Sequence, residues 1–370
     1  MKGVSLFLLV SSLSLLIILN VINLPLYTSG IFVYAQTNEN KTEEREEEIP
    51  GALFAQNQGN PMINDSNLKV QTVFKGLQHP TTMAFLGPND ILVLEKEKGT
   101  VDRIINGNLL AKPLLKVNVA SEVEEGMLGI AISKNKTESN NNHTYVFLYF
   151  TAKIGNNTSS SSDSSNGTSS NKLNNTDSQN GESFVANRLY RYEFVNGELV
   201  NPKLLLELPG TPGPRHNGGA IIIGPDNNLY IPIGDVDGHI SQAQNTKDGG
   251  PPDGSGGILR ITQDGKPVGN GIIGDRSPAN KYFAYGIRNS FGLDFDPVTG
   301  KLWDTENGPS YGDEINLVEP GFNSGWLLVQ GKAPADLNYS KFENFDGKGK
   351  YRDPEFTWFR TVGPTKNFVS

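Results

Sequence analysis

The sequence contains no cysteine in 370 residues. That absence excludes a disulfide framework, a thiolate metal site and a cysteine nucleophile. Basic residues are outnumbered, with 32 Lys and Arg against 40 Asp and Glu, which gives a net charge of −8. This balance argues against non-specific nucleic-acid binding, which depends on excess positive charge. Only four histidines are present for acid–base or metal chemistry: His79, His143, His216 and His239.

Long amphipathic helical patterns are also missing beyond the N-terminal region. In their place, short apolar runs alternate with turns, and the chain holds 41 glycines and 22 prolines, which favour turns. The sequence therefore predicts an all-β protein.

The N-terminus has the features of an export signal. Lys2 precedes an apolar run from Val4 to about Leu26, and Ala35 offers a small residue before a cleavage point at Gln36. We therefore predict a signal peptide over 1–35 and an extracellular or cell-surface location. A retained membrane anchor is the alternative, because the run is near spanning length.

Two polar segments interrupt the remaining chain. Residues 36–67 carry a run of acidic residues and are expected to form a disordered linker. Residues 156–181 consist almost entirely of Ser, Asn, Gly, Asp and Thr, so they cannot bury an apolar face. Because Tyr145–Thr151 and Arg188–Phe194 on either side have strand chemistry, this segment is expected to be a surface loop of one hairpin. Residues 68–370 are thus predicted to form one domain.

One hairpin pattern recurs along that domain: an apolar strand, a turn of Pro, Asp, Asn or Gly, and a second apolar strand. Copies occur at Met83–Leu94, Ala220–Ile231 and Leu293–Trp303, and a looser copy starts at Leu128–Ser133. A further strand-like run follows the hairpins, for example Gly257–Ile261. Repeats of about 40 residues or more favour the blades of a β-propeller over the alternative, a β-sandwich.

His216 is the histidine best placed for chemistry. It lies in the segment Pro212–Gly219, where glycines allow backbone or ligand to approach closely just before a strand. Taken alone, a loop histidine is more often a structural hydrogen-bonding residue than a base. His79 precedes a proline and His143 lies in the Asn-rich loop, so both are expected at the surface.

Two other segments carry candidate groups. Arg288 and Asn289 precede a strand and can present a cation and an amide to a ligand. Taken alone, an arginine that packs between blades is the simpler interpretation. Glu306–Leu317 combines a turn with Asp313 and Glu314, which offer the oxygen ligands that calcium takes. The spacing is not that of an EF-hand.

Considered together and in order, these segments resemble the soluble PQQ-dependent glucose/sorbosone (aldose sugar) dehydrogenase family over Leu77–Trp358. The motifs that carry the resemblance are Glu124–Gly129, Arg215–Gly219, Tyr285–Asn289, Gly308–Asn316 and Gly325–Trp326.

That resemblance implies a six-bladed propeller with PQQ on its axis, a sugar substrate and an external electron acceptor. His216 matches the general base that takes the proton of the anomeric hydroxyl, and the product is a lactone. The implied cofactor contacts are Glu124, Arg288 and Asn289. Calcium at PQQ is implied at the carbonyls of Gly308 and Pro309, and a second calcium at Glu314 with the carbonyl of Ser324.

The sequence departs from the family pattern in several places. Glu124 stands where the family usually has Gln, and Ser324 where it usually has Tyr. Phe356–Thr365 resembles the entry to a further blade, and Val70–Phe74 an early strand that pairs with the last one. These features predict a C-terminally incomplete propeller of about four to five blades. A non-catalytic propeller that binds sugar or protein, and a calcium-dependent lactonase, are the alternatives.

Overall fold

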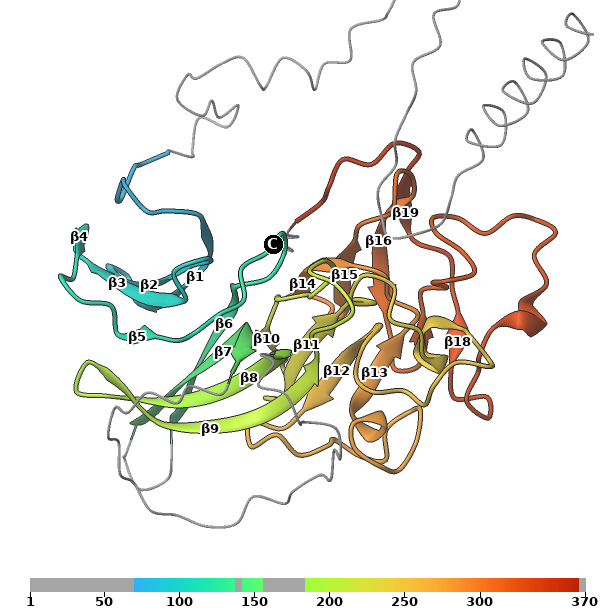
Figure 1. Ribbon diagram of the computed structural model, residues 1–370, viewed down its shortest axis with the longest axis horizontal. Coiled ribbons are helices and arrows are strands. Elements are labelled where there is room, and N and C mark those ends of the chain that lie inside the picture. Colours follow the sequence, from blue (N-terminus) through green and yellow to red (C-terminus); the bar gives the residue numbers. More distant parts are fainter. Residues whose placement is uncertain (1–69, 137–141, 156–183, 366–370) are drawn as a thin grey trace, which may run out of the picture. The chain divides into compact units, whose positions relative to one another are not determined.

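The computed structural model describes residues 70–136, 142–155 and 184–365 (Figure 1). The predicted signal peptide or anchor, the linker and the low-complexity loop lie outside these residues. Contacts separate Met1–Val70 from Gln71–Ser370, and the elements below all belong to the second unit. Within the described ranges there is no α-helix, and no helix is long and apolar enough to cross a membrane. The prediction of an all-β fold is confirmed for the residues that the structure describes.

The strands form four sheets, whose first strands follow one another along the chain; the last strands of the third and fourth sheets alternate in sequence. The first sheet contains β1 (Pro80–Gly87), β2 (Asp90–Glu95), β3 (Thr100–Ile105), β4 (Asn108–Leu109) and β5 (Leu115–Lys116). The second contains β6 (Met127–Lys136), β7 (Asn142–Ile154), β8 (Phe184–Val195) and β9 (Glu198–Pro209). Figure 1 shows β8 and β9 as a long curved pair.

The third and fourth sheets hold the remaining strands. The third contains β10 (Ile222–Ile223), β11 (Leu229–Ile233), β12 (Gly257–Ile261) and β13 (Tyr282–Tyr285), extended in parallel by β17 (Phe322–Asn323) and β18 (Lys350–Tyr351). The fourth contains β14 (Ser290–Phe295), β15 (Leu302–Glu306), β16 (Asp313–Val318) and β19 (Phe356–Trp358). Three short 3-10 helices complete the described elements: η2 (Gln242–Gln244), η3 (Ala279–Lys281) and η4 (Tyr339–Lys341).

The repeated hairpins are confirmed as the antiparallel pairs β1–β2, β6–β7, β10–β11 and β14–β15. Strands β7 and β8 pair with Tyr145 opposite Glu193, so they form the hairpin expected around the low-complexity loop. His143 is exposed as expected, but it lies in β7 and not in a loop.

Two expectations about the ends of the domain are wrong. Phe356–Trp358 does not begin a new sheet; it pairs with β16 as the last strand of the fourth sheet, with Trp358 opposite Asp313. Val70–Phe74 is not a strand in this structure. An apolar alternation identifies a segment that can pair, but its partner depends on which sheet edge lies within reach.

The sheets stack because their central strands bury both faces. Along β7, Val146, Leu148 and Phe150 pack in one cluster with the first sheet, whereas Phe147 and Tyr149 pack in another cluster with the third. This division follows from the alternation of side chains along a strand. Strand β11 repeats the pattern, since its odd-numbered residues face the second sheet and Tyr230 faces the fourth. The result is a propeller-like succession of sheets in chain order.

Replacing Phe147 by Ala is expected to lower the free energy of unfolding by about 3–5 kcal/mol, because the ring is fully buried between two sheets. Phe184→Ala is the matched control, since that ring is 54% exposed and its loss is expected to cost less than about 0.5 kcal/mol. Denaturant unfolding of the two variants measures the difference. Equal losses would show that the inter-sheet cluster does not stabilise the fold.

Candidate functional site

The segment that carries His216 runs from β9 to β10, between the second and third sheets. The hydroxyl of Tyr149, on β7, donates to the carbonyl of Asn217 at 2.7 Å, and both residues are fully buried. Gly218 has φ +71°, and a Cβ there would lie 2.2 Å from the carbonyl oxygen of Pro232. A side chain at this position is therefore excluded by both conformation and space. The segment is held tightly in place beside His216.

His216 is oriented by a buried carboxylate. Its Nδ1 lies 2.5 Å from Oδ1 of Asp235, and the two side chains are 9% and 4% exposed. Asp235 lies two residues after the end of the buried strand β11, and its other oxygen accepts the indole N–H of Trp326 at 2.8 Å. Because the carboxylate accepts Nδ1–H, the neutral imidazole presents Nε2 as a hydrogen-bond acceptor.

Glu124 joins three of the predicted site segments. Its carboxylate accepts the main-chain N–H of His216 at 2.6 Å and the side-chain amide of Asn289 at 3.4 Å. Its own N–H donates to the carbonyl of Pro214 at 3.0 Å. A glutamate at this position therefore cross-links the connections that enter the second, third and fourth sheets.

Arg288 lies beside this group. Burial lowers the pKa of its guanidinium, and the carboxylates of Asp235 and Glu306 oppose that shift. One terminal N–H donates to the carbonyl of Asn307 at 2.7 Å, and the guanidinium lies over the ring of Trp326 at 5.4 Å from its centroid. Within the described residues, Nε of Arg288 and Oδ1 of Asn289 are buried without a hydrogen-bond partner. Both atoms remain available to a ligand.

Three carboxyl groups close to this part of the site are buried: Asp304 and Glu306 on β15, and Glu314 on β16. Burial is the largest cause that raises the pKa of Asp304 and of Glu314 to about 7, and it also raises the pKa of Glu306 well above its ordinary value. Their mutual repulsion adds to the shift of Glu306. The hydroxyl of Ser324 lies within 2.7 Å of Glu306 and 3.1 Å of Glu314.

The Gly308 turn connects β15 with β16. Asp313 fixes the turn, because one of its oxygens accepts the N–H of Gly308 at 2.8 Å and the other accepts two N–H groups, of Val362 and Gly363. In the described part of the chain no donor reaches the carbonyl oxygen of Gly308 or of Pro309. No three Asp, Glu or His side chains of that part converge as metal ligands.

The structure thus brings Glu124, His216, Arg288 and Asn289 together, with the Gly308 turn beside Arg288. Sequence reasoning missed Asp235 and the role of Trp326 as its second partner. A signal for Asp235 was present, since the acid comes after the apolar run Leu229–Ile233 with only Gly234 between them, where a strand ends. The partnership with Trp326, 91 residues further on, left no local signal.

The model of the glucose / sorbosone dehydrogenase family matches residues 77–369. This chain belongs to that family. It is 31% identical over 285 residues to the uncharacterised protein slr1608 of Synechocystis sp., covering 72% of this chain and 60% of that protein. It is 27% identical to quinoprotein glucose dehydrogenase B of Acinetobacter calcoaceticus, covering 75% and 57%. The chain therefore spans about three fifths of the length of these two relatives.

Among solved structures, this family member is similar to the PQQ-bound form of the aldose sugar dehydrogenase of Streptomyces coelicolor. The TM-score is 0.55 with 27% sequence identity, covering 78% of this chain and 71% of that one. The sheets described above therefore have the β-propeller-like arrangement of glucose / sorbosone dehydrogenases.

The buried carboxyl groups predict how the stability of this family member depends on pH. A raised pKa means that the folded state favours the protonated form of Asp304, so its contribution is fully present below about pH 4 and is lost as the pH rises through about 7. The free energy of unfolding is expected to fall over this range in chelator-treated protein. Asp304→Asn should make the fall shallower, as measured by urea unfolding at several pH values. An unchanged slope would contradict the assignment.

Proposed function

We propose that this chain oxidises aldose sugars at C1 to lactones, with PQQ and calcium as cofactors, and passes electrons to an external acceptor. The observation that carries the proposal is the buried pair of His216 and Asp235, held beside Glu124, Asn289 and Arg288. The proposed architecture is that of the six-bladed propeller family, with about four to five blades in this chain, four of which are the described sheets. The proposed location is outside the cytoplasmic membrane, after cleavage of the predicted signal peptide at residues 1–35; an N-terminal anchor is the alternative.

His216 would act as the general base. With Asp235 fixing Nδ1–H, Nε2 takes the proton of the anomeric hydroxyl while hydride leaves C1. Asp235 then stabilises the imidazolium that forms. When bound, PQQ supplies a quinone that accepts this hydride. The side chains of His216 and Asp235 are already packed and hydrogen-bonded to each other. The imidazole is therefore oriented before substrate binds, and little conformational entropy is lost in the reaction step.

The residues present are compatible with PQQ. The buried Nε–H of Arg288 and Oδ1 of Asn289 have no partner among the described residues, so a ligand that accepts one hydrogen bond and donates another would satisfy both. Arg288 also places a cation where negative charge develops during reduction. The carboxylate of Glu124 is engaged by two donors, which offsets the repulsion expected between it and an anionic cofactor.

Calcium fits one of the two implied sites. The carbonyls of Gly308 and Pro309 accept no hydrogen bond from the described residues, and they are hard oxygen ligands. The second site is different, because four groups already lie within hydrogen-bonding distance of the Glu314 carboxylate. They are the N–H groups of Asn316, Gln330 and Gly331 and the hydroxyl of Ser324, which lies nearer to Glu306. A calcium ion at Glu314 and Ser324 does not fit without displacing one of them, so the proposal includes only the ion at the Gly308 turn.

The test is reconstitution of the chain with PQQ and calcium, followed by glucose-dependent reduction of an artificial electron acceptor. His216→Ala should lower kcat by at least about a hundredfold, since general-base catalysis contributes about that much or more. His239→Ala is the matched control, because His239 has a similar aspartate contact, 2.5 Å to Asp253, outside the site. Sugar binding without any oxidation would instead support a non-catalytic binding propeller.

Asp235→Asn separates orientation from binding. The amide is isosteric with the carboxylate but no longer stabilises the imidazolium, so kcat should fall by about tenfold or more with little change in KM. Steady-state kinetics with varied glucose concentration gives both constants. A rise in KM at constant kcat would show that Asp235 serves sugar binding and not the proton transfer.

A further inference from the structure

His216 has a main-chain conformation that few residues with a side chain adopt. Its φ is +61°, in the left-handed region, where the Cβ lies too close to the following carbonyl oxygen. Gly218 and Gly219 also have positive φ, but they carry no side chain that this conformation would strain. A strained conformation of this kind persists only when the surrounding contacts determine it. The contacts around His216 therefore have to hold it in place.

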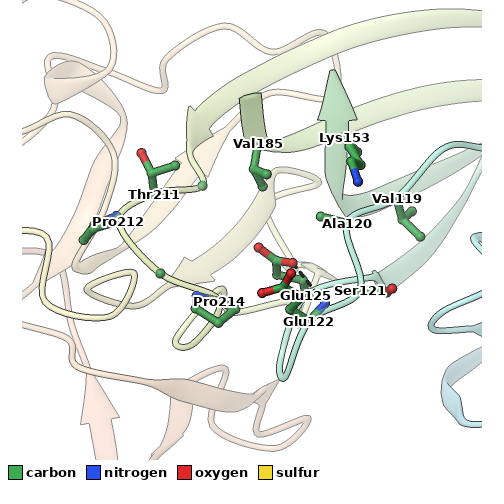
Figure 2. Close-up of a pocket in the computed structure, with 12 residues that line it drawn as sticks. Val119, Ala120, Ser121, Glu122, Glu125, Lys153, Val185, Thr211, Pro212 and Pro214 are labelled. Carbon is green, nitrogen blue, oxygen red and sulfur yellow. Dashed lines mark hydrogen bonds between the residues drawn. The ribbon is translucent and has the colours of Figure 1, made fainter. Parts of the chain in front are cut away.

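Side-chain packing does not supply that constraint where the chain approaches His216. Gly210–Pro214 borders a cavity of about 370 Å³, and Figure 2 shows Thr211 and Pro212 at its edge. Both of these residues are exposed, and Glu125 lines the same cavity. Because the cavity leaves this segment without packed neighbours on one side, hydrogen bonds have to fix the chain at His216.

Hydrogen bonds hold the main chain on both sides of His216. Its N–H donates to Glu124 at 2.6 Å, and its carbonyl accepts the N–H of Gly234 at 3.1 Å. The carbonyl of the next residue, Asn217, accepts the hydroxyl of Tyr149 on β7 at 2.7 Å. Three successive peptide groups are thereby fixed, and with them the φ and ψ of His216.

Asn187, on β8, ties the two ends of the connection between β9 and β10 together. It is fully buried, and its side-chain amide donates to the carbonyl of Pro209 at 2.7 Å and to Oδ1 of Asn217 at 2.8 Å. Its own Oδ1 accepts the hydroxyl of Thr151 at 2.9 Å. Since that hydroxyl occupies the oxygen, the NH₂ end of Asn187 faces the connection. One side chain of the second sheet thus anchors the chain at both Pro209 and Asn217.

We propose that Asn187 and Tyr149 are positioning residues, which hold His216 in its left-handed conformation so that the imidazole faces Asp235. A return of φ to negative values would turn the Cα–Cβ bond of His216 and carry the ring away from the Asp235 carboxylate, which lies 2.5 Å from Nδ1. The effect of this positioning on catalysis rests on the proposed function, in which His216 is the general base.

Steady-state kinetics of the reconstituted chain test the positioning role. Asn187→Ala removes two donors and should lower kcat for glucose about tenfold, because only the fraction of molecules with His216 beside Asp235 is active. KM should change less than about twofold, since the buried Asn187 does not reach a substrate. Tyr149→Phe removes one hydroxyl and keeps the core packing, and it should lower kcat in the same way.

Tyr282→Phe is the matched control for the loss of a buried hydroxyl. The hydroxyl of Tyr282 also donates to a main-chain carbonyl, that of Ser255 at 2.6 Å, but not to the connection that carries His216. This variant should keep the wild-type kcat and KM. Circular dichroism and thermal unfolding establish that each variant is folded. If Asn187→Ala does not fold, Tyr149→Phe decides the question, because phenylalanine fills the same core position.

Nitrogen NMR of the imidazole rings reports the geometry without any activity. The chain has four histidines, and the signals of His216 are those that His216→Ala removes. In the cofactor-free chain at about pH 8, where a histidine of ordinary pKa is neutral, His216 should be the Nδ1–H tautomer, because Asp235 accepts that proton. Asn187→Ala and Tyr149→Phe should lose this preference, and Tyr282→Phe should keep it.

The two measurements separate failure of this inference from failure of the proposed function. If the tautomer responds as expected but no form oxidises sugar, the positioning role stands and the dehydrogenase function fails. If the wild-type chain oxidises glucose while both variants keep the Nδ1–H tautomer, the function stands and the positioning role is overturned, whatever their kcat. An equal response in Tyr282→Phe also overturns it, because the loss of any buried hydroxyl would then suffice. No oxidation together with an unchanged tautomer overturns both.

Discussion

The structure depends on the burial of both faces of its central strands. Each such strand sends alternate side chains to two different neighbours, as Phe147 and Leu148 do on β7. A sheet with two apolar faces needs both of them covered, and the second and third sheets each pack against a neighbouring sheet on both sides. Because the neighbours are supplied in chain order, the connections between successive sheets meet one another. The site is assembled from those connections.

That origin explains the order of the site residues. Glu124 precedes the second sheet, His216 precedes the third, and Arg288 with Asn289 precedes the fourth. Each lies where the chain leaves one sheet and enters the next. Connections of this kind contribute little to the apolar core. Polar side chains are therefore tolerated there, and the rigid sheets hold them in position. The Glu124 carboxylate then holds two of these connections together through hydrogen bonds that a shorter side chain could not reach.

One guanidinium carries much of the buried charge at the site. Arg288 is surrounded by Asp235, Glu306, Glu124 and Asp313, whose negative charges oppose the effect of its burial. Burial raises the pKa of Asp304, Glu306 and Glu314 on β15 and β16, although each of these carboxyl groups accepts hydrogen bonds that oppose the shift. Stability is given up here in favour of a fixed arrangement of charge, a pattern common at functional sites.

The sequence alone determined the all-β class, the recurring hairpins and the segments that carry His216, Arg288 and Asn289, because alternation and turn residues are local signals. It could not assign Phe356–Trp358 to the fourth sheet, since pairing depends on which strand edge is near in space. Nor could it join Asp235 to His216 and Trp326, or place Glu125 in a cavity beside Glu124. Those relations depend on long-range packing of sheets, which no spacing along the chain encodes.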